Sequence, residues 1–158
     1  MLPEKYLFNN YQTEYIMLKT ILSISGKPGL YKLVSRGKNM LIVEALADKK
    51  RFPAYGNEKI VSLGDIAIYT EEDDVPLSEV LTAMKKKEDG AVVALDLKKA
   101  SSDELFAYLA EVLPGFDRDR VHASDVKKLI SWYNLLVNSG MTDFEEETVA
   151  EENAEEEK

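Results

Sequence analysis

The stretch from Gly26 to Thr70 constrains the fold more than any other part of the chain. It contains several short apolar runs, and residues that favour turns, such as Gly56-Asn57 and Gly64-Asp65, separate each run from the next. Short runs at spacings of about ten residues are typical of a small antiparallel barrel or sandwich. The sequence therefore predicts a compact β unit in this stretch.

Within this stretch we expect strands over 30–35, 40–46, 51–55 and 66–70. Residues 36–39 form the predicted connection between the first two of these strands, with Gly37 at a positive φ angle. Residues 18–25 form either one or two helical turns or a first strand, and 59–63 form either a short strand or a 3₁₀ turn. Pro53 favours a sheet edge or a strand end for 51–55, because proline has no N–H to donate to a ladder.

The chain after Thr70 has helical patterns. The first helix begins with Pro76 at its first position and ends at Gly90, and its apolar residues recur at helical spacing: Leu77, Val80, Leu81 and Met84. Residues 91–97 are apolar without helical spacing, so we interpret them as a short strand or an extended linker.

Two further helices follow this linker. Ser101 or Ser102 caps the earlier one, Ser101 and Glu104 have the spacing of a capping box, and Pro114-Gly115 ends it. Ser124 caps the later one and Gly140 closes it. We expect these two helices to pack together as a hairpin.

The predicted domain organisation has four parts. Residues 1–16 are an extension that is not native if Met17 is the natural start, 17–90 are a β-barrel plus a helix, and 91–141 are a helical hairpin. Residues 142–158 are a disordered acidic tail, because they are too charged and too poor in apolar groups to fold alone. The predicted fold class is α+β.

The net charge of −9 is distributed unevenly. Residues 141–158 contain nine acids and one Lys, whereas residues 17–70 contain nine Lys or Arg and four acids. The predicted β unit is therefore the basic part of an acidic chain. Such a surface can attract nucleic acid or acidic partners, but the ordinary solvated surface of a small barrel is the commoner explanation of such an imbalance.

The sequence has no pattern typical of an enzyme. There is no Cys, His122 is the sole His, no glycine-rich loop matches a phosphate cradle, and no Ser lies in a nucleophile elbow. We expect no catalytic, metal-binding or cofactor-binding residues. The longest uncharged stretch, 129–142, is too short to span a bilayer, which favours a soluble cytoplasmic protein without membrane contact.

Aromatic and basic side chains in the β unit are the best candidates for a binding surface. Small barrels bind peptides or single-stranded nucleic acid with such residues. The alternative is that the aromatic rings fill the barrel core. The candidate residues are Tyr31, Arg36, Lys38, Arg51, Phe52, Tyr55 and Tyr69.

Five segments resemble a family of small bacterial proteins that consist of one domain of unknown function followed by a second. The resemblance covers about Met17 to Glu147 and is carried by SGKPGLYKLVSRGKN, RFPAY, SLGDIAIYT, LPGFDRDRV and SDVKKLISWYNLL. It supports Met17 as the natural start and implies no activity. The β unit is also similar to an SH3-like barrel in strand count and turn spacing.

The sequence therefore favours a non-enzymatic, cytoplasmic protein-interaction or adaptor module that binds an unidentified protein through its barrel. The alternative is RNA or DNA binding by the basic barrel, with the acidic tail competing for the same surface. A homodimer is a further expectation, because an apolar face of the helical hairpin can complete its burial against a second copy.

Overall fold

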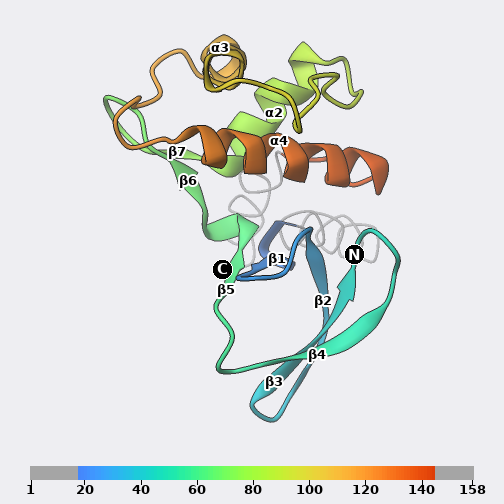
Figure 1. Ribbon diagram of the computed structural model, residues 1–158. Coiled ribbons are helices and arrows are strands. Elements are labelled where there is room, and N and C mark those ends of the chain that lie inside the picture. Colours follow the sequence, from blue (N-terminus) through green and yellow to red (C-terminus); the bar gives the residue numbers. More distant parts are fainter. Residues whose placement is uncertain (1–17, 145–158) are drawn as a thin grey trace, which may run out of the picture.

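The computed structural model describes residues 18–144, which form a curled β-sheet below three helices (Figure 1). The sheet has the order β4-β3-β2-β1-β5, and each neighbouring pair is antiparallel. Its strands are β1 (Ile21–Ile24), β2 (Tyr31–Gly37), β3 (Met40–Ala45), β4 (Arg51–Tyr55) and β5 (Ile60–Ser62). The fold is α+β, as predicted.

The sheet is open, whereas the sequence predicts a small antiparallel barrel or sandwich. Within residues 18–144, β4 and β5 each pair with one strand only, and they do not pair with each other. The two edges are nevertheless close, because Phe52 of β4 and Ile60 of β5 pack on the same apolar cluster. Lys27 Nζ also lies 3.5 Å from Glu58 Oε1 in the loop that joins these strands. The sheet thus curls around its own small core.

Strand β4 is an edge strand, as Pro53 predicts. The Ala45 N–H donates to Lys50 O at 2.9 Å, and donors in an antiparallel pair alternate in direction, so the Phe52 N–H faces β3. Pro53 therefore occupies an outward-facing position, where its missing N–H removes no ladder bond. It also leaves a gap in the row of donors on the open edge.

Two details of the β unit differ from the sequence prediction. Strand β2 continues through Gly37, and Asn39 takes the left-handed conformation with φ 61°. Asparagine tolerates this conformation because its short polar side chain can hydrogen-bond locally. Residues 66–70 were expected to form the last barrel strand, but β6 (Ala67–Ile68) pairs with β7 (Val75–Pro76) in a separate hairpin.

A 3₁₀ turn, η1 (Leu63–Asp65), directs the chain away from the sheet before β6. Ser62 caps it, since its Oγ accepts a hydrogen bond from the Gly64 N–H at 3.2 Å. A Cβ on Gly64 would lie 3.0 Å from the Lys19 Cα, so this turn needs glycine to pack against the chain entering β1. The segment 66–70 therefore contributes its strand, β6, to the separate two-stranded sheet with β7.

The three helices are α2 (Leu77–Lys87), α3 (Ser102–Val112) and α4 (Ala123–Asn138). Ser101 forms the predicted capping box: its Oγ accepts from the Glu104 N–H, and the Glu104 carboxylate accepts from the Ser101 N–H. The sequence predicted Pro76 at the first position of α2, but Pro76 is its N-cap and the helix begins one residue later, at Leu77. His122, and not Ser124, is the N-cap of α4, because the Asp125 carboxylate accepts from the His122 N–H at 3.0 Å.

Helix α4 lies between the sheet and the other two helices (Figure 1). One apolar core joins all three layers, and its buried members include Ile21 and Leu63 from the β unit, Leu81 from α2, Leu109 from α3 and Ile130 from α4. The linker at 91–97 forms no strand. It is fixed to α4, because Asn134 Oδ1 accepts from the Val93 N–H at 2.8 Å and the Tyr133 hydroxyl donates to Ala91 O.

The folded part reaches Phe144, beyond the predicted start of the tail at residue 142. Phe144 is 2% exposed and its ring centroid lies 6.4 Å from that of Tyr133. Lys85 Nζ also donates to Thr142 O at 2.8 Å. The expectations for residues 1–16 and for the tail after 144 lie outside the described residues, and the domain division at residue 90 stays a prediction. No helix within 18–144 is long and apolar enough to cross a membrane.

Candidate functional site

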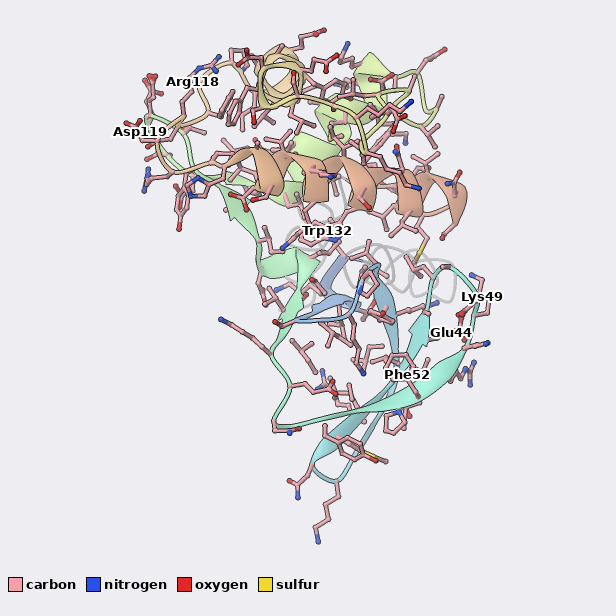
Figure 2. All side chains as sticks on the ribbon, in the orientation of Figure 1. Glu44, Lys49, Phe52, Arg118, Asp119 and Trp132 are labelled. Carbon is pink, nitrogen blue, oxygen red and sulfur yellow. The ribbon has the colours of Figure 1, made fainter. Side chains whose placement is uncertain are left out.

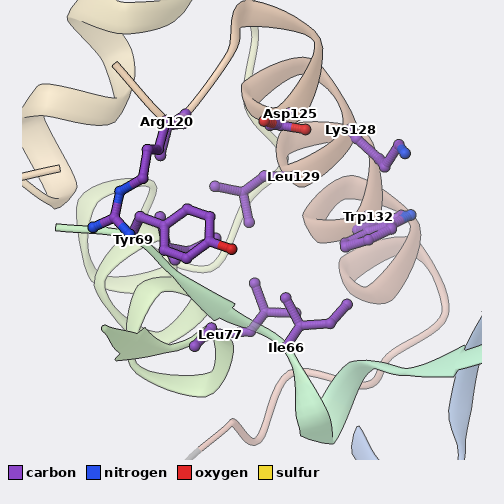
Figure 3. A pocket seen from close by; sticks show the side chains of 11 residues that line it. Ile66, Tyr69, Leu77, Arg120, Asp125, Lys128, Leu129 and Trp132 are labelled. Carbon is purple, nitrogen blue, oxygen red and sulfur yellow. The ribbon is translucent and has the colours of Figure 1, made fainter. Parts of the chain in front are cut away.

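A pocket of about 240 Å³ lies between the β6–β7 hairpin and the side of α4 (Figure 3). We call it the hairpin pocket. The residues that line it come from three separate parts of the chain: Ile66, Ala67, Ile68, Tyr69, Leu77, Arg120, Val121, Asp125, Lys128, Leu129 and Trp132.

Helical spacing explains the wall that α4 contributes. Asp125 and Leu129 are four residues apart, as are Lys128 and Trp132, so all four side chains project from one side of the helix. Tyr69, which follows β6, forms the opposite wall, and Figure 3 shows its hydroxyl directed toward the side of the pocket where Trp132 lies. The pocket thus has two aromatic walls and a rim that carries both charges.

Arg120 supports the Tyr69 wall from behind. Its guanidinium lies 4.2 Å from the centroid of the Tyr69 ring, and its Nη2 donates to Thr70 O at 3.3 Å. Arg120 Nε also donates to Asp117 Oδ2 at 2.8 Å. This hydrogen bond lowers the pKa of Asp117 from its ordinary value and raises that of Arg120. The wall is therefore held in place although Tyr69 is 44% exposed.

The chemistry of the hairpin pocket is suited to binding an apolar group. Its floor of Ile66, Leu77 and Leu129 has no polar side chain, and the carboxylate of Asp125 on the rim already accepts the His122 N–H. Nothing in this arrangement pairs a nucleophile with a base. Within residues 18–144 no three His, Asp or Glu side chains are grouped closely enough to hold a metal ion.

Two of the predicted site residues lie inside the curled sheet. Tyr31 is buried and its ring meets Phe52 edge-on at 5.4 Å. The Tyr31 hydroxyl donates to Pro28 O at 2.7 Å, and Lys27 Nζ covers Phe52 at 4.5 Å from the ring centroid. In this structure both rings are part of the small core of the sheet.

The other predicted residues are divided among three places. Arg36, Lys38 and Tyr55 are exposed at the far end of the β2–β3 hairpin, which we call the distal tip. Arg51 is engaged with Glu44, since its Nε donates to Oε1 at 2.9 Å. Tyr69 lies apart from all of these, in the hairpin pocket.

The binding surface predicted from the sequence did not include the residues that α4 and its preceding loop bring to the pocket. Trp132 carries a detectable signal, because it is the sole Trp and lies beside the apolar stripe of α4. Arg120 and Leu129 carry no such signal. Their role depends on the β6–β7 hairpin packing beside α4, which the local sequence does not encode.

Two family comparisons match consecutive parts of the chain. Residues 18–63 match the family described as "Domain of unknown function (DUF5606)", and residues 66–136 match "Domain of unknown function (DUF6852)". The first range covers the five-stranded sheet, and the second covers the β6–β7 hairpin and the helices except the last two residues of α4, so the two matches meet at η1. Every residue that lines the hairpin pocket falls within the second range.

A solved relative is similar over most of the chain. It is a protein from Bacteroides vulgatus with a solution NMR structure, and it is 70% identical with a TM-score of 0.69. The alignment covers 81% of this chain and 91% of the relative. Comparison with curated proteins gave no significant match.

Proposed function

We propose that this chain, which belongs to the family of bacterial proteins that join these two domains of unknown function, is a non-enzymatic protein-interaction module. The hairpin pocket receives an apolar side chain of a protein partner. One observation carries this proposal, namely an open apolar pocket between Tyr69 and Trp132 with a charged rim.

The energetics of protein interfaces support this reading of the pocket. Binding energy in such interfaces is concentrated where an anchor side chain fills a well-packed apolar pocket surrounded by polar groups. Burying one Leu or Phe side chain contributes about 1.5–3 kcal/mol. Because Arg120 already holds Tyr69 in place, an incoming side chain loses little of this gain to ordering the wall.

Selection from a random peptide library displayed on phage tests the proposal. The full chain should enrich peptides with a shared Leu, Ile, Met or Phe position, and Tyr69→Ser should lose most of their binding. Tyr55→Ser is the matched control, because Tyr55 is 52% exposed at the distal tip. Peptides without an apolar anchor, or equal binding by Tyr69→Ser and wild type, would contradict the proposal.

Nucleic-acid binding at the distal tip is a second candidate. Arg36, Lys38 and Tyr55 are exposed together there, a combination of cations and an aromatic ring that suits single strands. The acid nearest in sequence to these two cations, Glu44, accepts from Arg51 Nε at 2.9 Å, and Glu58, the acid nearest to Tyr55, lies 3.5 Å from Lys27 Nζ. The tip therefore carries positive charge that is not neutralised locally.

Fluorescence anisotropy with labelled dT20 and rU20 tests this candidate. Binding should weaken steeply between 50 and 200 mM salt, and Tyr55→Ser should reduce it while Tyr69→Ser does not. A chain ending at Phe144 should bind more tightly than the full chain, because residues 145–158 contain eight acids and one Lys. Absence of binding by either chain at low salt would end this candidate.

A further inference from the structure

A second depression, of about 580 Å³, shares Lys128 and Trp132 with the hairpin pocket. We call it the basic groove. It lies between α4 and the loop that joins β1 to β2, and Figure 2 shows Trp132 between α4 and the β unit. Its lining residues are Ser23, Ile24, Ser25, Gly26, Lys27, Pro28, Gly29, Leu97, Ser124, Lys127, Lys128, Ser131 and Trp132.

The lining of the basic groove has one sign of charge. Three lysines and four serines line it, and among the described residues no Asp or Glu does. Lys27 is partly neutralised by Glu58, at 3.5 Å, and Asp125 lies on the other flank of α4, in the hairpin pocket. Lys127 and Lys128 are exposed and supply charge from adjacent positions of the helix. The groove therefore attracts an anionic ligand whose oxygens can also accept from the serine hydroxyls.

The wall opposite α4 is fixed by local bonds. Gly26 and Gly29 adopt positive φ angles of 84° and 90°, which glycine allows without strain. The Lys27 N–H donates to Ile24 O at 3.0 Å, and the Tyr31 hydroxyl donates to Pro28 O. A groove with such a wall requires little ordering when a ligand enters.

We propose that the basic groove binds the carboxylates of an acidic peptide segment whose neighbouring apolar side chain fills the hairpin pocket. This inference rests on the proposed function of that pocket. Ser124 and Ser131 are seven residues apart on α4, or about 10 Å at the helical rise. An extended peptide covers that length with about three residues. The recognised motif is thus an apolar residue with Asp or Glu within about three positions.

Intrinsic fluorescence gives a direct readout, because Trp132 is the sole Trp and lines both sites. The probes are acetyl-Leu-Gly-Glu-Glu-Glu-amide and its Gln-Gln-Gln counterpart, titrated into the full chain. We expect the acidic probe to bind about five- to tenfold more tightly at 50 mM salt, with the difference shrinking at 500 mM.

Charge reversal in the groove should remove this preference. The test variant is Lys127→Glu/Lys128→Glu, and Lys127→Gln/Lys128→Gln is a milder version in case the reversal disturbs folding. The matched control, Lys50→Glu/Lys86→Glu, makes the same change in net charge at exposed lysines outside the groove and should retain the preference.

The possible failures are distinguishable. Equal affinity for the two Leu probes, with both lost in Tyr69→Ser, would overturn the acidic motif and leave the hairpin pocket intact. Unchanged affinity when Leu is replaced by Gly in the acidic probe would support the groove and overturn the apolar anchor. If the oligonucleotide dT10 binds more tightly than the acidic probe and displaces it, the proposal that the groove binds a peptide is overturned. No fluorescence change with any probe would overturn both.

Discussion

Replacing Phe144 tests whether the fold extends past the end of α4. Phe144 is 2% exposed, belongs to the main core and packs against Tyr133, whose side chain is also fully buried. Phe144→Ala deletes a full aromatic ring from this position. If the segment after α4 were a loose tail, as its composition predicts, the substitution would have almost no effect.

The expected loss of stability follows from the contacts of this ring. Phe-to-Ala substitutions in protein cores cost about 3–5 kcal/mol, and an aromatic pair contributes about 0.5–1.5 kcal/mol of such a loss. Phe144 is six residues after the end of α4, at Asn138, so the short segment around it can rearrange and limit the cost. We therefore expect a decrease in the free energy of unfolding of about 3 kcal/mol.

Urea unfolding followed by Trp132 fluorescence measures this loss. Val34→Ala is the control, because Val34 is an apolar residue that is 38% exposed, and it should change stability by less than about 0.5 kcal/mol. A loss of that same small size for Phe144→Ala would refute the assignment of residues 141–144 to the folded unit.

Three further perturbations test local features. Ser101→Ala removes the capping box of α3 and should cost about 1 kcal/mol in urea unfolding, whereas an unchanged midpoint would contradict the assigned role. Gly64→Ala forces a Cβ against backbone at 3.0 Å and should cost about 1–3 kcal/mol. Gly115→Ala, where nothing lies within 4 Å, should be close to neutral, and equal effects at the two glycines would refute the steric argument. Arg120→Ala should raise the pKa of Asp117 toward its usual value in an NMR titration. A lowered folded-state pKa gives stability that is present above the unfolded-state pKa and is lost as pH falls through the folded-state pKa. The wild type should therefore lose this contribution on acidification and Arg120→Ala should not, and acid limbs of equal steepness in the two proteins would contradict the assignment.

Local signals predicted most of the individual elements. Ser101 and Glu104 fix the start of α3 within four residues of sequence, and Pro53 indicates an edge strand through the absence of one N–H. Both signals act through the backbone of their own segment. They therefore hold regardless of what the segment packs against.

Pairing partners were not predictable in the same way. The alternation in 66–70 suits any half-buried strand, and it does not indicate that β6, after the turn at Leu63–Asp65, pairs with β7 and not with the five-stranded sheet. The acidic composition of 142–158 likewise gave no indication that Phe144 is buried, because this burial depends on the contact of its ring with Tyr133.

The candidate site shows the same limit. The sequence indicated Tyr69 as a candidate but grouped it with Tyr31 and Phe52, which lie in the small core of the sheet. The partners of Tyr69 in the pocket are Arg120 and Trp132, more than 50 residues later in the chain. A surface assembled from such distant segments requires the tertiary arrangement before its residues can be grouped.

The central claim is that the hairpin pocket receives an apolar side chain, and NMR mapping on the ¹⁵N-labelled full chain tests it most directly. Titration with acetyl-Leu-Gly-Glu-Glu-Glu-amide should shift the Trp132 indole N–H and the backbone amides of 66–69 and 128–132, while the amide of Tyr55 stays in place. Saturating shifts confined to the distal tip, or no shifts at millimolar peptide, would contradict the claim.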